Sequence, residues 1–290
     1  MNNSFATVFN RFGNFYRRSG LSLKSFIISK HTFNQNLKNK RFYIIFFYFL
    51  LPVLGSIFDV LISEPSYYSG KAYAVYQIHQ SLNNTLQVWW MSIFGQLFII
   101  LIASDAISSE FEKGTILSLK SRPISDIDIF LGKFIGITLL SSILVIPGGF
   151  IIYLTQIWTY SPKNFWWVFW HSLDELIVSL LVVILGFMLL LSICFLFSSI
   201  FNKSLQATLV SLLVIFAVQL LSSVFSFSDN LISKFNITRY LQHFLNPVLY
   251  NVNTITTSGS ITNELIGFIA LIVILQIIGF WIFSKKEVHQ

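Results

Sequence analysis

Six runs of apolar residues, each about as long as a bilayer is thick, constrain this chain more than any other feature. They occupy Phe42–Ile62, Leu86–Ile107, Gly132–Ile157, Leu173–Phe201, Leu205–Phe227 and Glu264–Phe283. A helix needs roughly 20 apolar residues to cross hydrocarbon, whereas a barrel strand is about half as long and alternates in polarity. With 54% apolar and 11% charged residues, the chain also has too little polar surface for a soluble globule of 290 residues. The sequence therefore predicts an all-α polytopic membrane protein with six transmembrane helices.

The distribution of Lys and Arg predicts the orientation. If the N-terminus lies inside, 15 of the 19 basic residues fall in inner segments and 4 in outer ones. This bias predicts a multi-pass membrane protein with both termini in the cytosol. We expect it in the plasma membrane. The net charge of +7 then indicates topology and attraction to anionic membrane lipids, and no nucleic-acid partner is expected.

The segments outside the six runs complete the domain plan. Residues 1–41 are basic with apolar residues at helical spacing, which predicts a cytosolic amphipathic interfacial segment. Residues 42–283 form the six-span domain, with an inner loop at 108–131 and a long outer segment at 228–263. That outer segment predicts a re-entrant element, because its apolar stretch is too short to span. Residues 284–290 form a cytosolic tail.

The inner loop carries an ordered pattern. It reads Glu110-Phe-Glu112-Lys113-Gly114-Thr115, followed by Leu119, Pro123-Ile-Ser125 and Leu131-Gly-Lys133. Alternating apolar and charged residues predict a short helix along the membrane, which Pro123 ends. Ser125 and Asp126 predict a cap for the next helix. A capped, solvated turn is the simpler interpretation of the helix signals alone.

This order of residues resembles the cytosolic loop of type-2 ABC exporter permeases, and the span plan resembles that family over the whole chain. Two positions depart from the family pattern, since Asp126 replaces an Arg and Leu117-Ser-Leu119 interrupts a leucine pair. The resemblance implies the transmembrane permease subunit of an ATP-driven ABC exporter. It would form the substrate path as a homo- or heterodimer and couple to a separate cytosolic ABC ATPase.

The same resemblance assigns roles to individual residues. It implies ATPase-coupling roles for Glu110, Glu112, Lys113, Gly114, Thr115, Pro123 and Ser125. No G-x-x-x-x-G-K-[ST] phosphate loop occurs, so we expect a chain that is not catalytic by itself and binds no cofactor. ATP and Mg are expected on the partner ATPase.

Polar residues deep in the apolar runs have two interpretations. Gln96, Gln219 and Gln276 fit ordinary interhelical hydrogen bonds. The resemblance instead implies that the second and fifth spans line a cavity between two permease copies. The substrate-cavity candidates on this interpretation are Phe94, Gln96, Phe98, Phe216 and Gln219. Pro147-Gly148-Gly149 predicts a kink in the third span.

The outer side carries further candidates. Trp89, Trp90, Trp158, Trp166, Trp167 and Trp170 predict an aromatic belt at the outer interface. His79, His171 and His243 lie in separate segments without a ligand spacing, so no metal site is predicted. Asn83 and Asn236 open N-x-T sequons, which leaves glycosylation open.

Two other functional classes remain alongside the exporter. A secondary transporter or channel would need repeats, broken helices or charges deep in the membrane. A non-transporting membrane scaffold subunit would show the same spans, and only the inner loop argues against it. The sequence does not identify the substrate.

Overall fold

The computed structural model of the protein describes residues 23–62, 71–116, 124–224 and 258–286. These residues form helices and no strand, which confirms the all-α fold. The helices are α2 (Leu23–Leu37), α3 (Lys40–Ile62), α4 (Lys71–Thr85), the π-helical turn η1 (Leu86–Trp90), α5 (Ile93–Ala103), α6 (Ser108–Glu112), α8 (Asp126–Tyr160), the 3-10 turn η2 (Pro162–Asn164), α9 (Phe165–His171), α10 (Leu173–Ile200), α11 (Ser204–Val224) and α13 (Ser258–Lys285).

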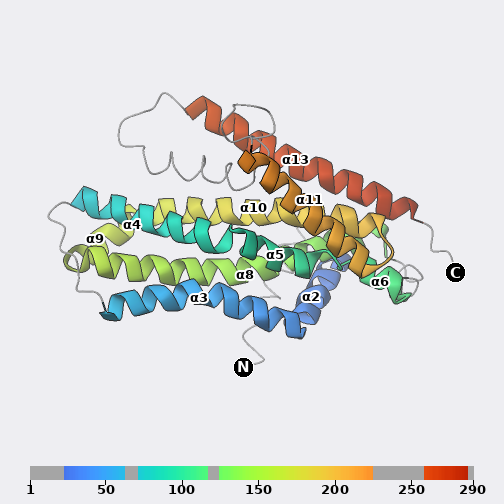
Figure 1. The fold of residues 1–290 in the computed structure, drawn as a ribbon, viewed down its shortest axis with the longest axis horizontal. Coiled ribbons are helices and arrows are strands. Elements are labelled where there is room, and N and C mark those ends of the chain that lie inside the picture. The colour runs from blue at the N-terminus through green and yellow to red at the C-terminus, as the bar shows by residue number, and fades with distance from the viewer. Residues whose placement is uncertain (1–22, 63–70, 117–123, 225–257, 287–290) are drawn as a thin grey trace.

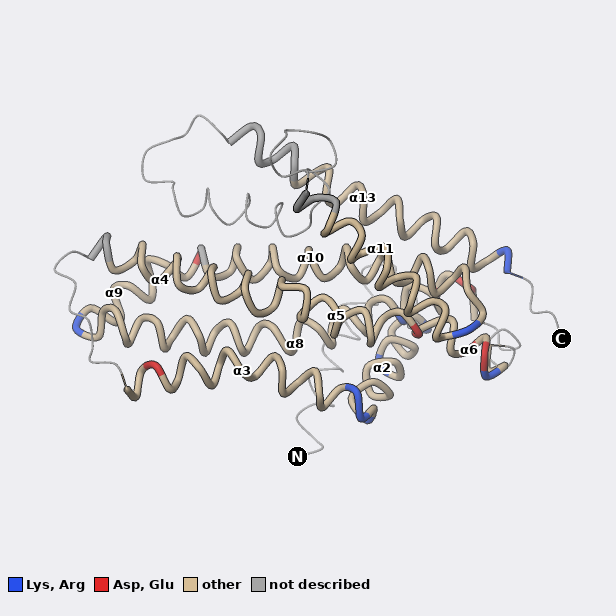
Figure 2. The backbone as a smooth tube through the Cα atoms, viewed as in Figure 1, with Lys and Arg blue, Asp and Glu red and all other residues tan. Residues whose placement is uncertain are grey.

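The long helices form an elongated bundle. Helices α3, α8 and α10 run along its long axis together with the row α4–η1–α5, and α11 and α13 lie obliquely beside them (Figure 1). Helix α8 is central, because it contacts α2, α3, α4 and α10. Charged residues gather mainly at the two ends (Figure 2). The end with α2 and α6 is called the α6 end below, and the opposite end the α9 end.

Five helical segments among the described residues are long and apolar enough to cross a membrane. They are Lys40–Ile62, Ile93–Glu112, Asp126–Tyr160, Leu176–Ile200 and Leu265–Lys285. The apolar part of α11, Ser204–Leu220, is shorter. Five of the described helical segments are therefore suited by length and composition to span a membrane, and the number of six spans stays a prediction. The predicted re-entrant segment, 228–263, lies outside the described residues as far as residue 257. Residues 1–22 and 287–290 also lie outside them.

The second apolar run is not one continuous helix. It starts as η1, breaks at Met91 and Ser92, and resumes as α5, with the Ser92 side chain accepting a bond from the Gly95 amide. Trp90 ends η1 and is 1% exposed, so it lies in the core and not in the predicted belt. Its indole lies against Gly148, where an added Cβ would come within 2.9 Å of the ring. The Gly148-Gly149 pair thus provides room for a large side chain.

Helix α2 packs across α8 through small residues. A Cβ at Gly132 would lie 2.7 Å from the Ser25 carbonyl oxygen, and one at Gly136 would lie 2.7 Å from that of Ser29. The close approach is reinforced by the Ser25 hydroxyl, which donates to the Asp128 carboxylate over 2.5 Å. Small residues four apart on two helices allow such close backbone contact. Helix α2 is therefore attached to α8, and its interfacial placement stays a prediction.

Candidate functional site

The inner loop begins with a short helix and a sharp turn. Helix α6 is followed by Lys113 and by Gly114, whose φ of 69° is the only positive φ in the part of the chain that the structure describes. Glycine adopts this conformation without a Cβ penalty. Lys113, Gly114 and Thr115 are exposed, so this turn is the part of the loop that faces away from the bundle.

A buried ion pair fixes α6 to α8. The Glu110 carboxylate lies 2.6 Å from the Lys133 ammonium, whose side chain is only 6% exposed. The same ammonium donates to the carbonyl oxygen of Ala106 over 2.5 Å. Glu110 therefore points into the bundle. Its contact with α8 lies within the chain and does not involve a partner protein. Sequence reasoning noted Lys133 only as part of the Leu-Gly-Lys pattern and missed the ion pair. A lysine in an apolar run, close to two glutamates, was the signal that could have indicated it.

The other glutamate of the loop caps a neighbouring helix. The Glu112 carboxylate accepts a hydrogen bond of 3.0 Å from the amide of Ser204, the first residue of α11. A negative charge at a helix N-terminus is favourable because the first amides lack partners there. Glu112 thus connects the loop to α11.

The start of the loop is bound to the end of α10. The Ser198 hydroxyl accepts bonds of 3.0 Å from the amide of Ile107 and 2.9 Å from that of Ser108. An ion pair of 2.9 Å between Arg41 and Asp105 adds a contact to the start of α3. The loop and the residues just before it are therefore held by contacts to four helices, α3, α8, α10 and α11.

The far side of the loop is only partly described. Pro123 lies outside the described residues. Ser125 is the N-cap of α8, and its hydroxyl oxygen accepts a bond from the Asp128 amide over 3.3 Å. The predicted cap is confirmed, while a coupling role for Ser125 stays a prediction.

The cavity candidates fall into two groups. Gln219 of α11 donates to the Gln96 side-chain oxygen of α5 over 2.6 Å, so the two form the interhelical hydrogen bond. Phe98 packs against Tyr48, with ring centroids 4.6 Å apart. Phe94 and Phe216 lie on the surface, 65% and 41% exposed. Within one chain, Gln96 and Gln219 are therefore bonded to each other, whereas the rings of Phe94 and Phe216 face outward. The cavity itself stays a prediction.

The α9 end holds the remaining candidates. His79 is 4% exposed, and its burial lowers the pKa to about 4, although the charge of Asp174 opposes this shift. His171 stacks on Trp167 at 4.1 Å between centroids. The described residues contain no group of three or more possible metal ligands, and His243 lies outside them.

The Asn83 sequon lies in a folded helix. Asn83 of α4 is 4% exposed, and its side-chain oxygen accepts a bond from the Ser179 hydroxyl over 3.2 Å. A glycan on this amide is incompatible with its burial. Asn236 lies outside the described residues.

Comparison with known proteins assigns this chain to a family. No curated protein matches the sequence significantly. Residues 26–288 match the family model described as ABC-2 family transporter protein, which covers the bundle from α2 to α13. The chain therefore belongs to the ABC-2 transporter family and is a multi-pass membrane permease of the ABC-2 type.

Proposed function

We propose that this chain is the permease subunit of an ATP-driven exporter, works as a dimer and is driven by a separate cytosolic ABC ATPase. The observation that carries the proposal is the way the α6 loop is held. Its turn at Gly114 is exposed, while Glu110 and Glu112 attach it to α8 and α11. An ATPase that moves the turn would therefore move both helices.

The charge distribution supports a cytosolic α6 end. Basic residues of the α2–α3 corner, of the α6 turn and of the end of α13 all lie there (Figure 2). Positive residues favour the cytosolic side of a membrane. In this orientation, both described ends of the chain face the ATPase. The membrane proposed for the protein is the plasma membrane.

The path from loop to substrate follows α11. This helix is attached to the loop at Ser204 and carries Gln219 and Phe216 further along. Packed helices move as rigid elements between discrete arrangements. A displacement at Ser204 would therefore change the Gln96–Gln219 contact.

The second permease copy is proposed to lie against the exposed face of α5 and α11. Phe94 and Phe216 are exposed there, together with Leu213 and Leu220, which are 66% and 50% exposed. Substrate would enter between the two copies from the cytosol or the inner leaflet. The chain itself is not catalytic in this scheme, since ATP and Mg are held by the partner.

Reconstitution tests the proposal. The chain and candidate cytosolic ATPases would be co-expressed, co-purified and placed in proteoliposomes, with the ATPase alone as control. We expect a stable complex whose ATP hydrolysis depends on the permease. Transport that persists without any ATPase would instead support a secondary transporter, and a complex without ATP-dependent transport would support a scaffold.

A further inference from the structure

Lys286 at the end of α13 forms an unusual set of contacts. Its ammonium donates to the carbonyl oxygens of Ser199, Ile200 and Phe201 at distances of 2.9, 3.3 and 2.9 Å. These carbonyls lie at the C-terminal end of α10, where a helix has no further intrahelical donors. A cation there is favourable because it also opposes the helix dipole. Lys286 thus caps α10.

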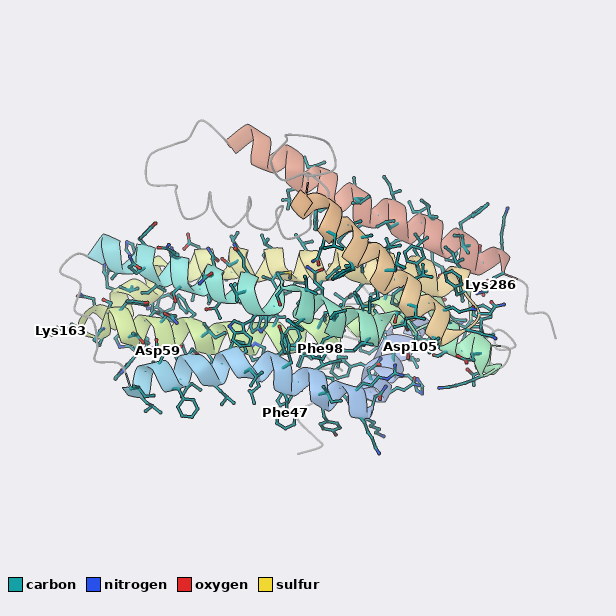
Figure 3. All side chains as sticks on the ribbon, viewed as in Figure 1. Phe47, Asp59, Phe98, Asp105, Lys163 and Lys286 are labelled. Carbon is teal, nitrogen blue, oxygen red and sulfur yellow. The ribbon has the colours of Figure 1, made fainter. Side chains whose placement is uncertain are left out.

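The same ammonium contacts the inner loop. It lies 4.2 Å from the ring centroid of Phe111 in α6, a cation–π geometry. Phe111 also packs edge-on against Phe283 of α13, with centroids 6.2 Å apart. Lys286 therefore stands where α6, α10 and α13 meet, and it lies at the same end of the bundle as Asp105 (Figure 3).

Lys286 is partly buried in this position. Partial burial lowers its pKa to about 8. The neighbouring Lys285 differs, because its ammonium lies over the ring of Trp281 at 4.3 Å, and both side chains are exposed. The chain thus offers two adjacent lysines with different surroundings, and Lys286 is the one that contacts α6 and α10.

We propose that Lys286 is a positioning residue for the α6 loop, which it fixes to the ends of α10 and α13 so that loop movement also reaches these helices. The proposal rests on the proposed function. It extends that function, because the loop contacts described above involve no residue of α13. It also assigns a role to a residue that the sequence places only in a cytosolic tail.

The test uses the full chain with three substitutions. Lys286→Met keeps most of the apolar stem and removes the donors and the charge. Lys286→Arg retains both, and Lys285→Met is the matched control. Each variant is purified alone and in complex with the ATPase that the wild-type chain stimulates.

Hydrogen exchange on the chain alone is the first readout. We expect Lys286→Met to speed amide exchange in residues 107–113 by about tenfold, since the cation–π contact between Lys286 and Phe111 is lost. Lys286→Arg should exchange nearly as the wild type does, and Lys285→Met should be unchanged. Equal exchange in Lys286→Met and Lys285→Met would overturn the proposal. This readout does not need the ATPase, so it remains decisive if the exporter function fails.

ATPase stimulation is the second readout. With Lys286→Met, we expect binding of the ATPase within about twofold of wild type and stimulation reduced by about tenfold. Lys286→Arg should restore at least half of the stimulation. Loss of binding, or no rescue by arginine, would contradict a positioning role.

Discussion

Glu110 and Lys133 form a 2.6 Å ion pair between the inner loop and the central helix, with side chains 18% and 6% exposed. Helix α2 also packs against α8, at Gly132 and Gly136. The Glu110–Lys133 pair therefore lies beside the contact between α2 and α8 at the α6 end. The loop and α2 are therefore attached to the same short stretch of α8.

Removing one member of the pair should uncouple and destabilise the protein. Glu110→Gln leaves the Lys133 ammonium without its anionic partner, and breaking such a buried pair costs about 3–5 kcal/mol. We expect lower thermal stability and loss of ATPase stimulation. Glu110→Gln with Lys133→Met should regain much of the stability without regaining stimulation, and a double variant with wild-type stimulation would contradict the role of the pair.

Gly114 provides a test of the loop turn. Its φ of 69° is costly for any residue with a Cβ, by about 1–2 kcal/mol. Space is not the obstacle, because no atom lies within 4 Å of an added Cβ. We expect Gly114→Ala to reduce ATPase stimulation with little change in the melting temperature.

Gly55→Ala is the matched control for the turn. Gly55 lies within α3, and an added Cβ there also meets no atom within 4 Å. If both alanine variants stimulated the ATPase equally, the turn conformation would be irrelevant to coupling.

The helices were predictable from sequence because backbone hydrogen bonds in a bilayer are satisfied within each helix. The break at Met91 and Ser92 was not predictable, since Leu86–Ile107 reads as one mainly apolar run, and the neighbouring Trp90 packs against Gly148 of α8. Such a contact involves residues far apart in the chain.

The candidate site divides in the same way. The turn at Gly114 and the cap at Ser125 follow from local backbone chemistry. The partners of Glu110 and Glu112 do not, because Lys133 and Ser204 are brought to them only by the packing of α8 and α11. Sequence alone therefore indicated the loop and not its internal contacts.

Acid should destabilise the α9 end through His79. Its pKa of about 4 in the folded protein lies below the ordinary value of 6.5, so the unfolded chain binds the additional proton between these values. Stability present above pH 6.5 is then lost as the pH falls through 6.5 toward 4, by about 3 kcal/mol.

Thermal unfolding from pH 7 to pH 4 measures this effect. We expect His79→Gln to flatten the dependence, while His171→Gln, at an exposed histidine of α9, leaves it unchanged. An identical pH dependence in wild type and His79→Gln would show that another group is responsible.

The Gln96–Gln219 bond joins the two helices proposed to line the substrate path, and a double-mutant cycle measures its strength. Interhelical bonds of this kind contribute about 0.6–1.7 kcal/mol in membranes. We expect Gln96→Leu and Gln219→Leu each to destabilise the protein, and the double variant to lose less than the sum. Gln276→Leu is the control, since Gln276 donates to Ser192 between α13 and α10 over 2.9 Å.

If the pair also lines the path, Gln96→Leu and Gln219→Leu will change the substrate dependence of ATP hydrolysis and Gln276→Leu will not. The same substrate dependence in all three would leave the pair with a structural role alone.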